Sequence, residues 1–118
     1  MDTFPKFMKH PVNRISQETQ YTKGIEGYVF DGLDGSQMAI WTYPGGGKSA
    51  EHLHDYDEYF VVVQGQYTVL MGGKRIPVRV GEEFLIPKGT LHSGEALAGT
   101  RAIYAFGGKR AQRVSEGA

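Results

Sequence analysis

Residues 59–63 read Tyr-Phe-Val-Val-Val, and this run is the strongest strand signal in the chain. Three consecutive β-branched residues favour an extended backbone, because their χ1 angles are restricted and they pack well on a pleated surface. Alternate residues of a strand point to opposite faces, and here both faces are apolar. One face therefore belongs to the core. The other must be covered by another sheet, by the N-terminal segment or by a second copy of the chain.

Short β-prone runs separated by turn signals lie on both sides of this strand. They cover residues 24–30, 38–43, 67–71, 76–80, 84–86 and 100–106. Glycine accounts for 17 of the 118 residues, about twice its average usage, and is spread along the chain, which favours many turns. No 11-residue window combines a helical stripe with helix caps. The pattern predicts an all-β sandwich or barrel of about eight short strands.

The length of 118 residues predicts one domain with one core. We divide it into an N-terminal arm (1–23), a barrel (24–108) and a C-terminal tail (109–118). The arm contains two prolines and is weakly patterned, so we expect irregular structure with at most one edge strand. The tail is short and charged, and we expect it to be loosely ordered.

Composition excludes several classes of protein. Thirteen basic residues balance thirteen acidic ones, so the basic excess of a nucleic-acid binder is missing. No apolar stretch approaches the roughly 20 residues of a membrane helix, and no secretory signal is evident, so we expect no membrane partner and a cytoplasmic location. The absence of cysteine removes disulfides, thiolate metal sites and cysteine nucleophiles. The two-faced apolar strand favours a homodimer.

Three of the four histidines lie in two segments with a distinctive spacing. The first segment reads Gly46-x5-His52-x-His54-x3-Glu58-x6-Gly65, and the second reads Gly81-x5-Pro87-Lys88-Gly89-x2-His92. On a strand, His52 and His54 project to the same face. Glu58 lies at the same phase and can return to that face if the chain bends through residues 55–57. His92 can arrive from the second segment, because proline fixes φ there and glycine permits a turn.

Imidazole nitrogens together with one carboxylate suit a borderline divalent metal. The pattern therefore predicts one divalent transition metal per chain, which could be Fe, Mn, Ni, Zn, Cu or Co. Four protein ligands on an octahedral ion leave two positions free, as a catalytic site requires. The competing interpretation is that the histidines are incidental surface or core residues, and the number of residues at fixed offsets argues against it.

These two segments, from Gly46 to His92, resemble the signature motifs of the cupins. The resemblance implies a double-stranded β-helix (jelly-roll) barrel, with His52, His54, Glu58 and His92 as metal ligands. The second motif of that family often ends in asparagine where this chain has Ala96. We therefore expect the loop over residues 93–99 to differ from relatives. The short spacing between the motifs is similar to that of small single-domain bacterial members.

Four further residues are candidates for a substrate pocket. Trp41 and Tyr43 precede the glycine loop of the first motif and could line a pocket or belong to the core. Arg101 could bind a carboxylate or phosphate if it points inward, and it is a surface arginine if it points outward. Tyr104 is one of several tyrosines that could donate a proton. No catalytic residue beyond the metal site can be assigned from these patterns.

Two functions remain open. The first is a small-molecule enzyme that uses its metal for dioxygenase-type or for Lewis-acid isomerase or lyase chemistry on an oxygen-rich substrate, since the resemblance covers all of these reactions. The second is a metal-dependent domain that binds or senses a small molecule without turnover. Such domains are usually fused to a second domain, for which 118 residues leave no room, so we favour the enzyme.

Overall fold

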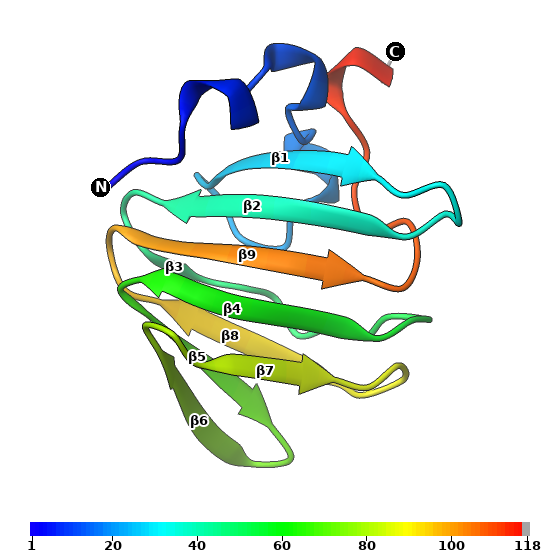
Figure 1. Cartoon of the computed structure of the whole chain (residues 1–118). Helices are drawn as coiled ribbons and strands as arrows, with labels where there is room; N and C mark the ends of the chain where they lie inside the picture. The colour runs from blue at the N-terminus through cyan, green and yellow to red at the C-terminus, as the bar shows by residue number, and fades with distance from the viewer. Residues whose placement is uncertain (117–118) are drawn as a thin grey trace.

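The computed structural model describes residues 1–116, which form two antiparallel sheets (Figure 1). The five-stranded sheet has the order β1-β2-β9-β4-β7, and the four-stranded sheet has the order β3-β8-β5-β6. The strands are β1 (Glu26–Asp31), β2 (Gln37–Tyr43), β3 (Gly47–Lys48), β4 (Glu58–Gln64), β5 (Gln66–Met71), β6 (Lys74–Arg79), β7 (Glu83–Ile86), β8 (His92–Ala96) and β9 (Thr100–Phe106). The predicted all-β jelly-roll fold is confirmed.

The core lies between the two sheets, and β4 contributes its centre. Phe60 and Val62 point inward and are completely buried. The ring of Phe60 stacks on Tyr104 of the neighbouring strand β9, with 5.2 Å between ring centroids. Val69 of the four-stranded sheet belongs to the same core cluster. This inward-facing set fills the barrel, and Tyr104 also lines the cavity described below.

The N-terminal arm covers part of the outer face of the five-stranded sheet. Phe4 packs there with Tyr28 and Ile40, and Met8 and Val63 are among the partly buried residues of this second apolar cluster. The arm was one of three covers expected from the sequence, and it accounts for the buried end of that face. The homodimer stays a prediction.

The arm and the tail are more ordered than the sequence indicates. The arm contains the 3₁₀ turns η1 (Lys6–Met8), η2 (Pro11–Asn13) and η3 (Gln17–Thr19), and the tail ends in η4 (Val114–Glu116). A β-bridge joins Ile15 of the arm to Arg113 of the tail. Ala111 is only 2% exposed. The expectation of a loosely ordered tail is wrong for residues 109–116, because the tail packs against the arm, and residues 117–118 lie outside the described residues.

Two strands were not predicted, and both belong to the four-stranded sheet. β3 is only two residues long, and β8 contains no β-branched residue. The extended form of β8 is imposed by its neighbour β5, with pairs running from Tyr67↔Ala96 to Met71↔His92. The expectation of a loop at residues 93–96 is therefore wrong, since tertiary pairing overrides weak local propensity. No helix within residues 1–116 has the length and apolar character needed to cross a membrane.

Candidate metal centre

The two motif segments meet through a pair of backbone hydrogen bonds at one end of the barrel. His52 and His92 form an isolated β-bridge in which each backbone N–H donates to the other's carbonyl at 2.9 Å. His54 lies in the following loop, where its carbonyl accepts a hydrogen bond from the backbone N–H of Gly89 at 2.8 Å. Glu58 opens β4. The first motif is thus extended at His52, as expected, but it is not a continuous strand.

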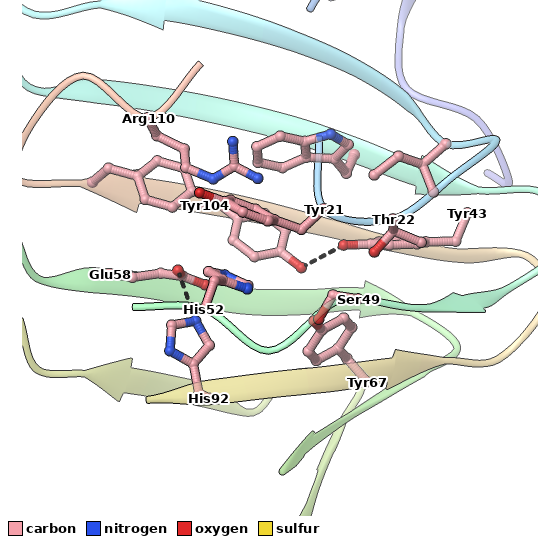
Figure 2. A pocket seen from close by; sticks show the side chains of 13 residues that line it. Tyr21, Thr22, Tyr43, Ser49, His52, Glu58, Tyr67, His92, Tyr104 and Arg110 are labelled. Atoms are coloured by element: carbon pink, nitrogen blue, oxygen red, sulfur yellow. Dashed lines mark hydrogen bonds and ion pairs between the residues drawn. The ribbon is translucent and has the colours of Figure 1, made fainter. Parts of the chain in front are cut away.

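The four side chains predicted to be ligands converge on one point. One nitrogen from each histidine and one oxygen from Glu58 all lie within 4.8 Å of one another. The carboxylate oxygen Oε1 of Glu58 lies 3.2 Å from Nε2 of His54 and 3.6 Å from Nε2 of His92. His54, Glu58 and His92 are buried, and His52 is half-buried at the rim. Figure 2 shows Glu58 and His92 facing each other across this end of the cavity.

A backbone carbonyl holds the other ring nitrogen, Nδ1, of His52 and of His92. Nδ1 of His52 lies 2.6 Å from the carbonyl oxygen of Ala50, and Nδ1 of His92 lies 2.8 Å from that of Thr90. A carbonyl can only accept, so both Nδ1 atoms carry the proton and both Nε2 atoms keep a free lone pair. This is the arrangement in which histidine ligates a metal through Nε2.

Two Nε2 atoms of the histidine cluster lack hydrogen-bond partners within the described part of the chain. Nε2 of His54 and of His92 are both buried, and neither is aligned for a hydrogen bond with Glu58 despite the short distances. Buried polar atoms without partners are rare and costly in folded proteins. These two nitrogens, Nε2 of His52 and the Glu58 carboxylate converge on a common point, so the residues present fit a bound metal ion.

The electrostatics of the cluster favour a charged Glu58 carboxylate and a neutral His52. Burial raises the pKa of Glu58, but contacts with His54 and His92 outweigh it and bring that pKa down to about 2. Burial lowers the pKa of His52 to about 4, so this imidazole is neutral at pH 7. Burial lowers the pKa of His92, but the nearby carboxylate of Glu58 and the carbonyl of Thr90 outweigh it, so the pKa of His92 is raised. A proton therefore competes with a metal ion more strongly at His92 than at His52.

Three of the four pocket candidates line the cavity beside this cluster, and one does not. Trp41, Tyr43 and Tyr104 line it and are also buried members of the core, so both interpretations of Trp41 and Tyr43 hold. The hydroxyls of Tyr43 and Tyr104 lie 2.8 Å apart (Figure 2). Burial raises both of their pKa values well above the ordinary 10, so both hydroxyls stay protonated at neutral pH.

Arg101 lies outside the cavity. The alternation of β9 turns its inward face to Ala102 and Tyr104 and places Arg101 on the outer face. There its guanidinium donates to the carbonyl of Met1 and to Gln64, each at 3.0 Å, and is only 5% exposed under the arm. The outward interpretation is correct, but Arg101 is neither an exposed arginine nor a pocket residue.

Sequence reasoning missed several cavity residues, among them Tyr21 of the arm and Arg110 of the tail. The ring of Tyr21 stacks flat on His52, with 3.8 Å between centroids and 1° between planes. The guanidinium carbon of Arg110 lies 4.6 Å from the centre of the Tyr21 ring. Both segments lack strand or helix periodicity, so no pattern in the sequence pointed to them.

The protein is thus a small jelly-roll barrel with three histidines and a glutamate gathered at one end, where they could hold a metal ion. The family model described as a cupin domain matches residues 39–107, more than half of the chain. The chain belongs to the cupin family.

Solved structures of other cupins share the fold. KdgF from a Halomonas species is 20% identical, with a TM-score of 0.64 over 86% of this chain and 96% of that one. An RmlC-like cupin from Shewanella frigidimarina is 17% identical, with a TM-score of 0.66 over 83% and 96% of the two chains. The polyketide cyclase RemF from Streptomyces resistomycificus is 16% identical, with a TM-score of 0.66 over 88% and 78%. At these identities the likeness shows the fold alone.

One sequence relative is the uncharacterized protein y4oW of Sinorhizobium fredii. It is 38% identical over 50 residues, which are 42% of this chain. The match spans about a quarter of that protein's length (23%).

Proposed function

We propose that this cupin is an enzyme that holds one divalent transition-metal ion through His52, His54, Glu58 and His92. The proposed substrate is a small oxygen-rich molecule. The observation that carries the proposal is the pair of buried, unpartnered Nε2 atoms aimed at the same point as the Glu58 carboxylate. A bound ion there would supply Lewis-acid or dioxygen-activating chemistry.

The remaining cavity residues bind and orient the substrate. The protonated hydroxyls of Tyr43 and Tyr104 can donate hydrogen bonds to substrate oxygens. Trp41 and Phe106 supply apolar walls that exclude water from the reacting atoms. Tyr21, stacked on His52, shields the metal site from solvent at the rim. A protected, partly polar cavity of this kind favours catalysis over a sensing role, which remains the alternative.

Metal analysis tests the ligand set directly. Protein purified without added metal should hold about one divalent ion per chain, and His54→Ala should weaken metal affinity by roughly 100-fold or more, since it removes a ligand rather than a residue behind one. His10→Ala is the matched control. His10 only accepts a hydrogen bond from the backbone of Val12 on the surface, so its loss should leave metal affinity unchanged. Equal affinity in all three proteins would remove the proposed site.

A further inference from the structure

The two ends of the chain meet above the metal site and form a cover, defined here as residues 16–25 and 109–113. The Nη1 group of Arg110 donates to the carbonyl of Thr19. The backbone N–H of Gln112 donates to Oγ1 of Thr19 at 3.3 Å, and the N–H of Ser16 donates to the carbonyl of Gln112 at 2.7 Å. Arg110 is therefore part of the wall of the cavity, although it lies beyond the last strand of the barrel.

Arg110 brings a permanent positive charge to the cavity. Its guanidinium carbon lies 4.6 Å from the ring centre of Tyr21, 5.3 Å from Trp41 and 5.8 Å from Phe106. Figure 2 shows this side chain reaching from the tail toward Tyr21 and Tyr104. Of its N–H groups, Nη1 has a protein acceptor, whereas Nε and Nη2 have none within residues 1–116. Two nitrogens of the guanidinium, with three N–H donors between them, are free to bind a ligand.

The charges that meet in the cavity are not balanced. Glu58 is the one acidic residue among the described residues that line it, and Arg110 is the one lysine or arginine. A divalent ion would add two positive charges to that of Arg110, against one negative charge from Glu58. Excess charge in a partly buried site is costly unless a counter-charge binds. An anionic ligand supplies that counter-charge.

We propose that Arg110 binds a carboxylate of the substrate, and that the substrate class is small hydroxy- or oxo-carboxylic acids. The inference rests on the metal-dependent function proposed above. An arginine fork matches the geometry of a carboxylate, which can accept two parallel hydrogen bonds. The hydroxyl or oxo oxygen beside that carboxylate then faces the histidine cluster. The paired hydroxyls of Tyr43 and Tyr104 serve the remaining oxygens.

The cover must move for such a substrate to enter. The cavity has a volume of about 30 Å³, which is room for about two water molecules. Tyr21 is 41% exposed and is the most accessible piece of the wall, so its rotation off His52 opens the cavity. Arg110 contacts both Tyr21 and Thr19. A carboxylate that accepts hydrogen bonds from its free N–H groups therefore binds at the place where the cover opens.

Matched pairs of ligands test the proposal on Co²⁺-loaded protein by calorimetry and by the visible spectrum of the metal. The two pairs of probes are glycerate with glycerol, and tartrate with threitol. In each pair the acid has a carboxylate where the alcohol has a CH2OH group. The natural protein should bind each acid more tightly than its alcohol. Arg110→Gln should weaken acid binding by about 10- to 100-fold and leave alcohol binding and Co²⁺ content unchanged. Arg110→Lys should retain part of the preference, because the charge remains and the fork is lost.

Arg113→Gln is the matched control, because Arg113 ties the same tail to Asp31 and to the carbonyl of Val29 without lining the cavity. It should lower the melting temperature and keep the preference for acids. The role of Arg110 is overturned if the natural protein does not prefer acids to alcohols. It is also overturned if Arg110→Gln and Arg113→Gln weaken acid binding equally. Failure of the natural protein to hold Co²⁺ overturns the metal-dependent function instead, so the two failures are distinguishable.

Discussion

The barrel and the cover hold their backbones in different ways. In the barrel, the backbone N–H and C=O groups of neighbouring strands bind one another, as in the six consecutive pairs between β5 and β6. In the cover, backbone pairs such as Ser16 with Gln112 are few, and single side chains make many of the hydrogen bonds to the backbone. Arg113 donates to the carbonyl of Val29 at 2.8 Å, and Gln37 accepts from the backbone N–H groups of Arg110 and Ala111 at 2.7 and 2.9 Å. Removing one side chain can therefore free the cover, while the barrel shares its stability over many contacts.

This difference has a functional meaning. The proposed metal site needs four side chains at fixed positions, and three of them are buried within the barrel end. The proposed substrate would need a wall that can open, and Tyr21 and Arg110 of the cover line the cavity there. Segments that move in function come from the less stable part of a structure. The predictions below separate the two regions, beginning with the largest expected effect.

Gly46→Ala should cause the largest loss in the free energy of unfolding. Gly46 has φ of +69°, where an alanine is strained, and an added Cβ would lie 2.6 Å from the carbonyl oxygen of Ala96 and 2.9 Å from the backbone nitrogen of Ala98. Because both neighbours are backbone atoms, strain and overpacking should together cost about 2–4 kcal/mol of the free energy of unfolding. Urea denaturation measures this loss.

The adjacent Gly45 provides the control. It has no positive φ, and a Cβ there would meet nothing within 4 Å, so Gly45→Ala should change the free energy of unfolding by less than about 0.5 kcal/mol. Similar losses of stability in the two variants would mean that the loop backbone can shift to accommodate either Cβ. The close contact of Gly46 with β8 would then not determine the cost.

The fold could be predicted from the sequence where local chemistry and tertiary pairing agree. Residues 59–63 are β-branched or aromatic, and they form the middle of β4 as expected. β8 could not be predicted, because its residues have weak strand propensity and are extended only by pairing with β5. The order of the tail was missed for the same reason. Its partners, such as Asn13 and Val29 for Arg113, are about 80 to 100 residues away in sequence.

The candidate site shows the same division. His52, His54, Glu58 and His92 could be selected from their spacing, because metal ligation restricts residue types at fixed offsets. Arg110 could not, since binding a ligand from a coil segment imposes no spacing. The orientation of Arg101 depends on the register of β9 and its burial on the path of the arm, which no local pattern specifies.

Gln37→Ala should release the tail with a smaller cost to the barrel. Gln37 is only 2% exposed, and its amide also donates to Asp31 and to the carbonyl of Ala111. Its loss leaves the buried backbone groups of Arg110 and Ala111 without partners, at about 1–3 kcal/mol. Hydrogen exchange should show faster exchange at these two amides, with Phe60 still protected.

Met38→Ala, on the same strand, is the control for Gln37→Ala. Met38 is 53% exposed and points away from the core, so the amides of the tail should keep their protection. A uniform rise in exchange across β4 and the tail in Gln37→Ala would contradict the division into two regions, because it would mean that they open together.

The smallest effect concerns the pH dependence of metal-free protein. Burial lowers the pKa of His52 from 6.5 to about 4, so the unfolded chain binds this proton more tightly and the fold loses stability as pH falls from 6.5 toward 4. For His92, burial lowers the pKa, but the contacts with Glu58 prevail and raise it. That stabilisation is complete below pH 6.5 and is lost as pH rises through the folded pKa. Stability should therefore be greatest near pH 6.5.

Urea denaturation of chelator-treated protein from pH 5 to 9 measures this maximum. Glu58 titrates below that range, since burial raises its pKa but the contacts with His54 and His92 outweigh burial and lower the pKa from 4.5 to about 2. His52 is half-buried, so the decline on the acidic side should be on the order of 1 kcal/mol. His52→Gln should abolish that decline and keep the alkaline one, because His92 and Glu58 remain together. An unchanged acidic decline would mean that a titratable group other than His52 causes it.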